Sequence, residues 1–176
     1  MIEIVKYNDD DLRDDEIDEV VTRVRAFIVS SKNNMIVGYT DEGFQLIGGY
    51  VGAGEDLIQG LKNIIFNESG IELDSRDVIE PFYEIRHYNK DYKGSGINRL
   101  SDLIYFCVKS DKMPNYKKLK LSEREIAEKM PLEMVRKSLL GKEIREYIEK
   151  EENQVNKIKA KELLMAYEKF KEIYKF

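Results

Sequence analysis

Residues 48–71, GGYVGAGEDLIQGLKNIIFNESGI, decide the fold, because they predict a loop, a helix and a helix stop in that order. Four of the first seven residues are glycine, which permits tight turns and close backbone approach. Glu55 and Asp56 follow, and acids suit the N-terminal end of a helix dipole. Apolar residues then recur at helical spacing until Gly70, a usual helix stop. We expect one helix over residues 56–68. The residues expected to pack it on a sheet are Leu57, Leu61 and Ile65.

The spacing of this stretch resembles the signature of the Nudix hydrolase family, the Nudix box. That box reads Gly, five residues, Glu, seven residues, Arg-Glu, an aliphatic, any residue, Glu-Glu, any residue, Gly and an aliphatic. The matching positions are Gly49, Glu55, Ile65, Glu68, Gly70 and Ile71. Asn63 replaces the arginine, and Ile64 and Asn67 replace the first two helix glutamates. The resemblance covers about residues 20–140 and implies an α/β/α sandwich around a mixed β-sheet.

The same resemblance implies magnesium-dependent cleavage of a diphosphate linked to a nucleoside or another group. Magnesium neutralises phosphate charge in such reactions and prefers carboxylate and water oxygens. Helix positions 64, 67 and 68 share one side of a helix, and the family has Glu at all three. The metal ligands that remain as candidates here are Gly48 through its carbonyl, Glu55, Asn67 and Glu68. Glu55 and Glu68 are also the candidate catalytic residues. Mg2+ is therefore expected to bind weakly, with a ligand's phosphates completing its shell.

Ile64 is the most informative departure from the box. Its presence at a metal-facing position removes a ligand or base and adds apolar surface to the helix. Asn63 also removes the arginine that, in the family, helps to hold the carboxylates in place. Losing the arginine and two glutamates together favours a metal site that is no longer used. In that case Glu55 would only charge a helix N-terminus and Glu68 would be a surface acid, and these roles stay open beside ligand roles.

Three arginines are candidates for ligand binding, because guanidinium groups suit bidentate contacts with phosphate. Arg25 lies on the strand predicted at 20–30, while Arg86 and Arg99 bracket a polar loop. In Nudix proteins the sheet beside the box commonly supplies such contacts, although a surface charge is the favoured interpretation of each arginine. Glu84 or Asp102 could supply a carboxylate from outside the helix, and the sequence does not choose between them.

Local patterns predict the remaining elements. Strands are expected at 2–7, 20–30, 35–39, 44–47, 78–88 and 100–108. Pro81 indicates an edge or a bulge in its strand. The acidic run 8–19 reads as a solvated loop or short helix. Ser122 with Glu125 forms a capping box, and Pro131 is expected to open a further helix. Residues 142–176 predict one amphipathic helix that packs on the domain or on a second copy.

Composition sets broader limits. We expect a Nudix-like domain at 1–141 with a helical extension at 142–176. A net charge of −5 gives no electrostatic footprint for nucleic acid. Cys107 is the single cysteine and His87 the single histidine, so an internal disulfide and a multi-histidine metal centre are excluded. With no signal peptide or membrane-spanning run in view, we expect a cytoplasmic monomer or homodimer without a membrane partner.

Two functions fit these observations. In the first, a Nudix-fold protein has lost ordinary diphosphatase activity and keeps a pocket for a nucleotide-like or phosphorylated ligand, or serves as an interaction module. In the second, a divergent hydrolase of a diphosphate-containing small molecule holds magnesium with Glu68, Glu55 and a carboxylate outside the helix. We favour the first, because the metal ligands are what the reaction needs most.

Overall fold

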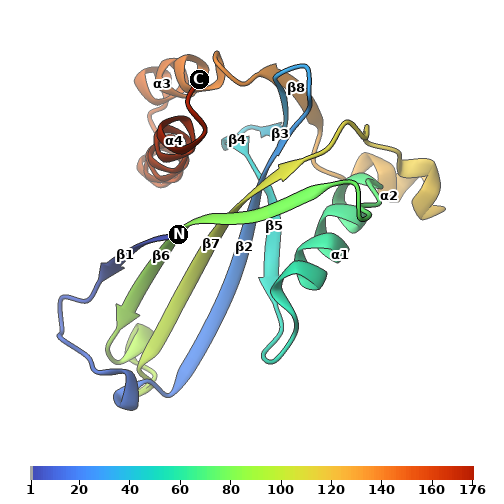
Figure 1. Cartoon of the computed structure of the whole chain (residues 1–176). Helices are drawn as coiled ribbons and strands as arrows, with labels where there is room; N and C mark the ends of the chain where they lie inside the picture. Colours follow the sequence, from blue (N-terminus) through green and yellow to red (C-terminus); the bar gives the residue numbers. More distant parts are fainter. Residues whose placement is uncertain (1) are drawn as a thin grey trace.

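A twisted β-sheet runs through the molecule between two layers of helices (Figure 1). This computed structural model describes residues 2–176, and within them the sheet has eight strands. These are β1 (Glu3–Tyr7), β2 (Glu19–Val29), β3 (Asn34–Thr40), β4 (Gly43–Gln45), β5 (Ile47–Val51), β6 (Val78–Asn89), β7 (Arg99–Lys109) and β8 (Leu132–Arg136). Strand order is β1-β6-β7-β2-β3-β4, with β5 paired to β2 and β8 to β3. The β1–β6 and β2–β7 pairs are parallel and the others antiparallel, so the mixed sheet predicted from the sequence is confirmed.

Helices cover both faces of this sheet. They are α1 (Leu57–Ser69), α2 (Glu123–Ala127), α3 (Leu140–Lys150) and α4 (Gln154–Tyr174), with short 3-10 turns at Asp14–Glu16, Tyr92–Gly94 and Tyr116–Leu119. Helix α1 lies against one face, and α3 with α4 lies against the other (Figure 1). Among the described residues, no helix has the length and apolarity needed to cross a bilayer.

Local chemistry sets both ends of α1. The Asp56 carboxylate accepts a hydrogen bond from the Gln59 amide at 2.8 Å, which makes Asp56 the N-cap. Gly70 ends the helix in the left-handed region at φ 71°, and its N–H donates to the Phe66 carbonyl. A Cβ at Gly70 would lie 1.9 Å from the Asn115 carbonyl oxygen, so both space and backbone conformation require glycine there. The helix predicted over residues 56–68 is confirmed, one residue later at each end.

The two-residue period of β2 and β7 divides the buried residues into two cores. On one face, Val24 and Ile104 are register partners in the α1-side core, which also contains Leu61 and Ile65 of α1. On the other face, the register partners Phe27 and Cys107 belong to the α4-side core. Because successive side chains of a strand point to opposite faces, these long strands serve both cores.

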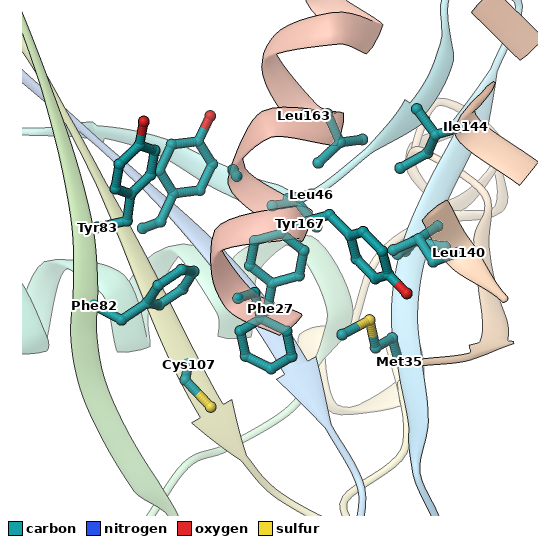
Figure 2. Packing of buried hydrophobic residues seen from close by; sticks show 14 of the residues in the cluster. Phe27, Met35, Leu46, Phe82, Tyr83, Cys107, Leu140, Ile144, Leu163 and Tyr167 are labelled. Carbon is teal, nitrogen blue, oxygen red and sulfur yellow. The ribbon is translucent and has the colours of Figure 1, made fainter. Parts of the chain in front are cut away.

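Aromatic rings dominate the α4-side core (Figure 2). The rings of Phe27 and Phe170 stack with centroids 4.9 Å apart, and Phe82 meets Phe170 edge-on at 5.4 Å. Tyr167 is buried among Met35 and Leu140, and its hydroxyl donates to the Lys137 carbonyl at 2.6 Å. The C-terminal helices therefore pack on the chain's own sheet.

The strand predicted at 44–47 is wrong in its boundaries. The strand is interrupted at Leu46, which lies between β4 and β5. Gly48 and Gly49 lie inside β5 rather than in a turn. Gly48 pairs with Arg25 of β2, so the glycines continue a strand that the sequence suggested they would end. The turn comes later, where the Glu55 amide donates to the Gly52 carbonyl at 3.1 Å.

The helix predicted from Pro131 is wrong as well. Residues Leu132–Arg136 form β8, which pairs with β3, and the Pro131 carbonyl accepts the Tyr39 N–H at 3.1 Å. An available strand edge satisfied these backbone groups, so tertiary pairing overrode local propensity. The Ser122 capping box that starts α2 is confirmed, and so is a bulge beside Pro81.

The single C-terminal helix predicted over 142–176 is two helices. Asn153 caps α4 by accepting from the amides of Val155 and Asn156, and an Asn within a charged run was the missed signal. Gly141, the last residue of the predicted first domain, lies inside α3. The predicted apolar stripe also divides: Phe170 is buried, while Val155 and Ile158 are 61% and 65% exposed.

We expect Phe170→Ala to lower the free energy of unfolding by about 3–5 kcal/mol, because it leaves a cavity among stacked rings. Ile158→Ala, on the same helix but exposed, should change it by less than about 0.5 kcal/mol. Urea unfolding of both variants measures the two values. Equal losses would contradict the assignment of α4 to the core.

Candidate functional site

Glu55 is held by its own turn. Its carboxylate accepts a hydrogen bond from the Gly52 amide at 3.0 Å. A Cβ built on Gly60 of α1 would lie 3.3 Å from the other carboxylate oxygen, so Glu55 folds back over the start of the helix. This contact orders the loop between β5 and α1. The predicted helix-terminal role of Glu55 thus has a specific partner, one turn before the helix.

Ile64 fills the place where the Nudix box has its first helix glutamate. A Cβ built on Gly49 of β5 would lie 3.5 Å from Ile64 Cδ1, an ordinary van der Waals distance. The side chain is half-buried and packs against the α1-side core. Asn63, next to it, is exposed and accepts a hydrogen bond from the Gln59 side chain at 3.0 Å. This side of α1 therefore presents an apolar side chain toward β5.

Asn67 and Glu68 close the box stretch. The Asn67 backbone carbonyl accepts a hydrogen bond from the Lys129 ammonium, while its amide side chain is exposed. Glu68 is half-buried, and its carboxylate adds to the effect of burial in raising the pKa of Tyr116. Within residues 2–176, no three His, Cys, Asp or Glu side chains gather closely enough to hold a metal ion. Of the three box positions on α1 that carry glutamate in the Nudix box, only Glu68 has a carboxylate here.

Loop, helix and stop occupy the frame of the box from Gly49 to Ile71, against a mixed sheet with helices on both faces. This arrangement agrees with the α/β/α sandwich that the sequence predicted. The box residues that match have structural roles here. Gly70, for example, ends α1 at a position where only glycine fits. The positions that differ from the box carry no replacement carboxylates.

Arg25 lies on the opposite face of the sheet from α1. It lines a cavity of about 190 Å3 between β2, β7 and α4, together with Arg23, Gln45, Tyr105, Lys159 and Glu162. A Cβ at Gly48 would lie 2.7 Å from Arg25 Cδ and 2.1 Å from the Val24 carbonyl oxygen. Glycine at position 48 therefore lets the Arg25 side chain lie across β5. We refer to this cavity as the Arg25 pocket.

Positive charge in the Arg25 pocket is only partly neutralised. Burial, and then the neighbouring Arg23, lower the pKa of Arg25. No carboxylate of residues 2–176 comes within 4.0 Å of either guanidinium, whereas Lys159 pairs with Glu42 at 2.7 Å. Arg23 and Arg25 attract an anion, whereas the Glu162 carboxylate, which opposes the pKa shift of Arg25, and the Glu42 carboxylate also line the cavity and act against that attraction.

Arg86 and Arg99 do not join Arg25. Arg86 sits on β6, on the α1 face, and pairs with the buried carboxylate of Glu84. Arg99 begins β7, where it pairs with Glu19 at 2.7 Å and covers the Tyr92 ring at 3.9 Å. The three candidate arginines therefore lie at three different places in the fold. The ion pair with Glu19 and the contact with the Tyr92 ring give Arg99 a structural role.

Glu84 and Asp102 form a close acidic pair beside Arg86, on the α1 face of the sheet. Glu84 is 6% exposed, and the Oδ1 atom of Asp102 is buried without a hydrogen-bond partner among the described residues. Burial, reinforced by Glu84, raises the pKa of Asp102 to about 6, while Arg86 opposes the shift. Both residues were candidates from the sequence. Their proximity follows from the register of β6 with β7, which the sequence does not show.

Lys159 and Glu162 also line the Arg25 pocket, and neither was predicted as a site residue from the sequence. Both belong to α4, whose expected role was packing alone. Their spacing of three, beside the buried Leu163, was the available signal, since such residues flank the buried face of a helix.

No protein-family model matches the sequence, and a search of curated proteins finds no relative. Solved structures give partial likenesses. A MutT structure from work on Aliivibrio salmonicida and Vibrio cholerae has 17% identity and a TM-score of 0.47, covering 69% of this chain and 82% of that one. A Bacillus halodurans MutT protein has 17% identity and a TM-score of 0.48, with coverage of 70% and 72%. A Deinococcus radiodurans protein has 17% identity and a TM-score of 0.47, with 71% of each chain covered. Likenesses of this size assign no activity to the chain.

Asp102 provides a test by pH. Its folded-state pKa is about 6 against an ordinary value of 3.8, so the folded protein holds the proton more tightly than the unfolded chain. The contribution of protonated Asp102 to the free energy of unfolding is fully present below about pH 4 and is lost as the pH rises through 6. Asp102→Asn should therefore exceed the parent in stability by about 1–3 kcal/mol at pH 7.5 and match it near pH 4.

Chemical denaturation across pH 4–8 checks this prediction. Asp10→Asn, at an exposed position, serves as the control and should show no such pH-dependent difference. A stability difference that does not change with pH would show that Asp102 titrates normally.

Proposed function

We propose that this chain is a Nudix-fold protein without ordinary magnesium-dependent diphosphatase activity, which binds a phosphorylated or nucleotide-like ligand at the Arg25 pocket. The observation that carries the loss of activity is the packing of Ile64 against the α1-side core, beside Gly49 of β5. Phosphoryl transfer asks the protein mainly for positioning and charge neutralisation. An apolar side chain packed at a metal-facing position supplies neither.

The other box residues point in the same direction. One oxygen of Glu55 accepts the Gly52 amide before the helix begins, and Glu68 is the only box carboxylate on α1 itself. Magnesium keeps several waters and is usually bound through one or two carboxylates together with substrate phosphates, so Glu68 alone would hold the ion weakly. We therefore assign the face of α1 that carries Ile64 a packing role rather than a catalytic one.

The Arg25 pocket supports the binding part of the proposal. Its volume of about 190 Å3 suits a phosphate or diphosphate group, and lies below the roughly 300–1,000 Å3 typical of sites that enclose whole ligands. The remainder of a ligand would extend out over the exposed Tyr50 ring, which lies 5.9 Å from the Arg23 guanidinium. Aromatic rings of this kind can stack on a base.

A divergent hydrolase is the second candidate, and Asp102 with Glu84 is the observation that favours it. These carboxyl groups lie on the α1 face, and a pKa of about 6 suits a general acid or base near neutral pH. Here the chemistry would depend on sheet carboxylates, with Glu68 as the contribution from α1. An interaction module without a small ligand is the outcome if neither site binds.

Pyrophosphate and ADP, without divalent cations, are suitable probes of the Arg25 pocket. We expect saturable binding by calorimetry, and Arg25→Met should weaken it about 10- to 100-fold, because a charge-assisted hydrogen bond contributes about 1.5–3 kcal/mol. Arg124→Met, at an arginine whose side chain is 87% exposed, should leave the affinity unchanged. Equal affinity of the parent and Arg25→Met would contradict the pocket assignment.

Magnesium alone should give no saturable heat with the parent protein. The triple variant Asn63→Arg, Ile64→Glu, Asn67→Glu should melt at a lower temperature, because it replaces an apolar contact with crowded carboxylates. Added magnesium should raise that temperature, since an ion that binds only the folded state stabilises it. Hydrolysis of a diphosphate substrate by the triple variant measures recovered chemistry.

Two outcomes would favour the hydrolase instead. A saturable magnesium isotherm of the parent that Glu68→Gln abolishes would place an ion on α1. Magnesium-dependent turnover of nucleoside diphosphate derivatives that Asp102→Asn abolishes would place the chemistry on the sheet.

A further inference from the structure

A larger cavity opens beyond the carboxyl ends of the parallel strands β2 and β7. Its volume is about 720 Å3, and its wall includes Val29 and Ser30 at the end of β2, Lys109 and Ser110 at the end of β7, and the last turns of α4. Ligands of open α/β sheets commonly bind outside the carboxyl ends of parallel strands. The Arg25 pocket uses other residues, in the middle of β2. We refer to this larger space as the Lys109 cavity.

One wall of the Lys109 cavity is apolar and aromatic. Phe170 and Tyr174 of α4 line it, with ring centroids 4.6 Å apart, beside the buried Cys107 of β7. Tyr174 is half-buried, so part of its ring is open to the cavity. Apolar surface of this kind takes the body of a small organic molecule, and a bare inorganic anion would leave it wet.

Positive charge predominates among the other lining residues. Four basic side chains face two carboxylates, which gives a net charge of +2. Lys112 is already neutralised, since it pairs with Asp77 at 2.6 Å and with Asp74 at 2.8 Å. Arg76 is paired too, with Asp74 at 2.7 Å. These pairs act within the protein and leave little charge for a ligand.

Lys109 and Lys137 are the least neutralised of the four basic residues, and their ammonium groups lie over aromatic rings, Lys109 over Tyr174 at 5.5 Å and Lys137 over Phe176 at 4.4 Å. The carboxylate nearest to Lys109 is Glu80 at 4.0 Å, and in residues 2–176 none comes that close to Lys137. Burial raises the pKa of the Cys107 thiol to about 11, and both lysines act against that rise. Both lysines line the cavity together with Cys107, Lys109 from the end of β7 and Lys137 from just after β8. Ser30, whose hydroxyl accepts the Asn34 amide at 3.3 Å, retains its own proton to donate.

We propose that the Lys109 cavity binds a small molecule with an anionic group on an aromatic body. The anionic group lies near Lys109 and Lys137, and the aromatic body lies on the accessible part of the Tyr174 ring. The volume falls within the range of small-molecule sites. The charge excludes a cationic ligand, and the aromatic wall favours a ring over a free phosphate ion.

The probe that tests this proposal is 1-naphthyl phosphate, titrated into the full-length protein at low salt. We expect saturable binding that weakens at least tenfold in the double variant Lys109→Met, Lys137→Met. The uncharged 1-naphthol and inorganic phosphate should each bind at least tenfold more weakly than 1-naphthyl phosphate. Lys161→Met, at an exposed lysine of the same helix as Tyr174, is the matched control and should bind like the parent.

Other variants separate this site from the Arg25 pocket and from loss of folding. Arg25→Met should keep the affinity for 1-naphthyl phosphate, whereas Tyr174→Ala should reduce it several-fold. Each single lysine variant should also reduce it several-fold, and thermal melting confirms that the variants are folded. The proposal is overturned if the parent does not bind, if the folded lysine variants bind like the parent, or if Arg25→Met abolishes binding.

Discussion

The parallel pairing of β2 with β7 is the constraint on which the rest of the structure depends. Eleven consecutive residues of each strand are in register, from Glu19 with Arg99 to Val29 with Lys109. Their alternation sends Val24 and Ile104 toward α1, and Phe27 and Tyr105 toward α4. Each strand therefore holds two cores together. This alternation also separates the chemistry, since the box helix and the Arg25 pocket lie on opposite faces of one sheet.

Sequence patterns predicted the elements whose determinants are local. The path from Gly49 to Gly70 depends on a capping carboxylate, an apolar face and a left-handed stop, all within one stretch. The sequence could not predict β8, because Pro131 starts a helix or a strand according to whether an edge such as β3 is free. It also joined α3 to α4, since helical periodicity continues across a cap such as Asn153.

The candidate site was less predictable than the fold, because it depends on strand register and side-chain direction. Arg25, Arg86 and Arg99 are equivalent by residue type, yet one faces a cavity and the other two are paired with acids. Spacing alone suggested that Glu55 was available, whereas in the fold it accepts the Gly52 amide. Ile64 is the exception. An apolar side chain cannot bind a metal ion, so its presence at position 64 already indicated that this residue packs against the core.

Helix α4 borders both cavities with one continuous rod of 21 residues. Lys159 and Glu162 line the Arg25 pocket near its beginning, and Phe170 and Tyr174 line the Lys109 cavity near its end. A helix moves as a unit, so a ligand that shifts α4 at one end alters the geometry at the other. Thermodynamic linkage makes such an effect reciprocal: if one occupant strengthens or weakens the second, the second changes the affinity of the first by the same factor.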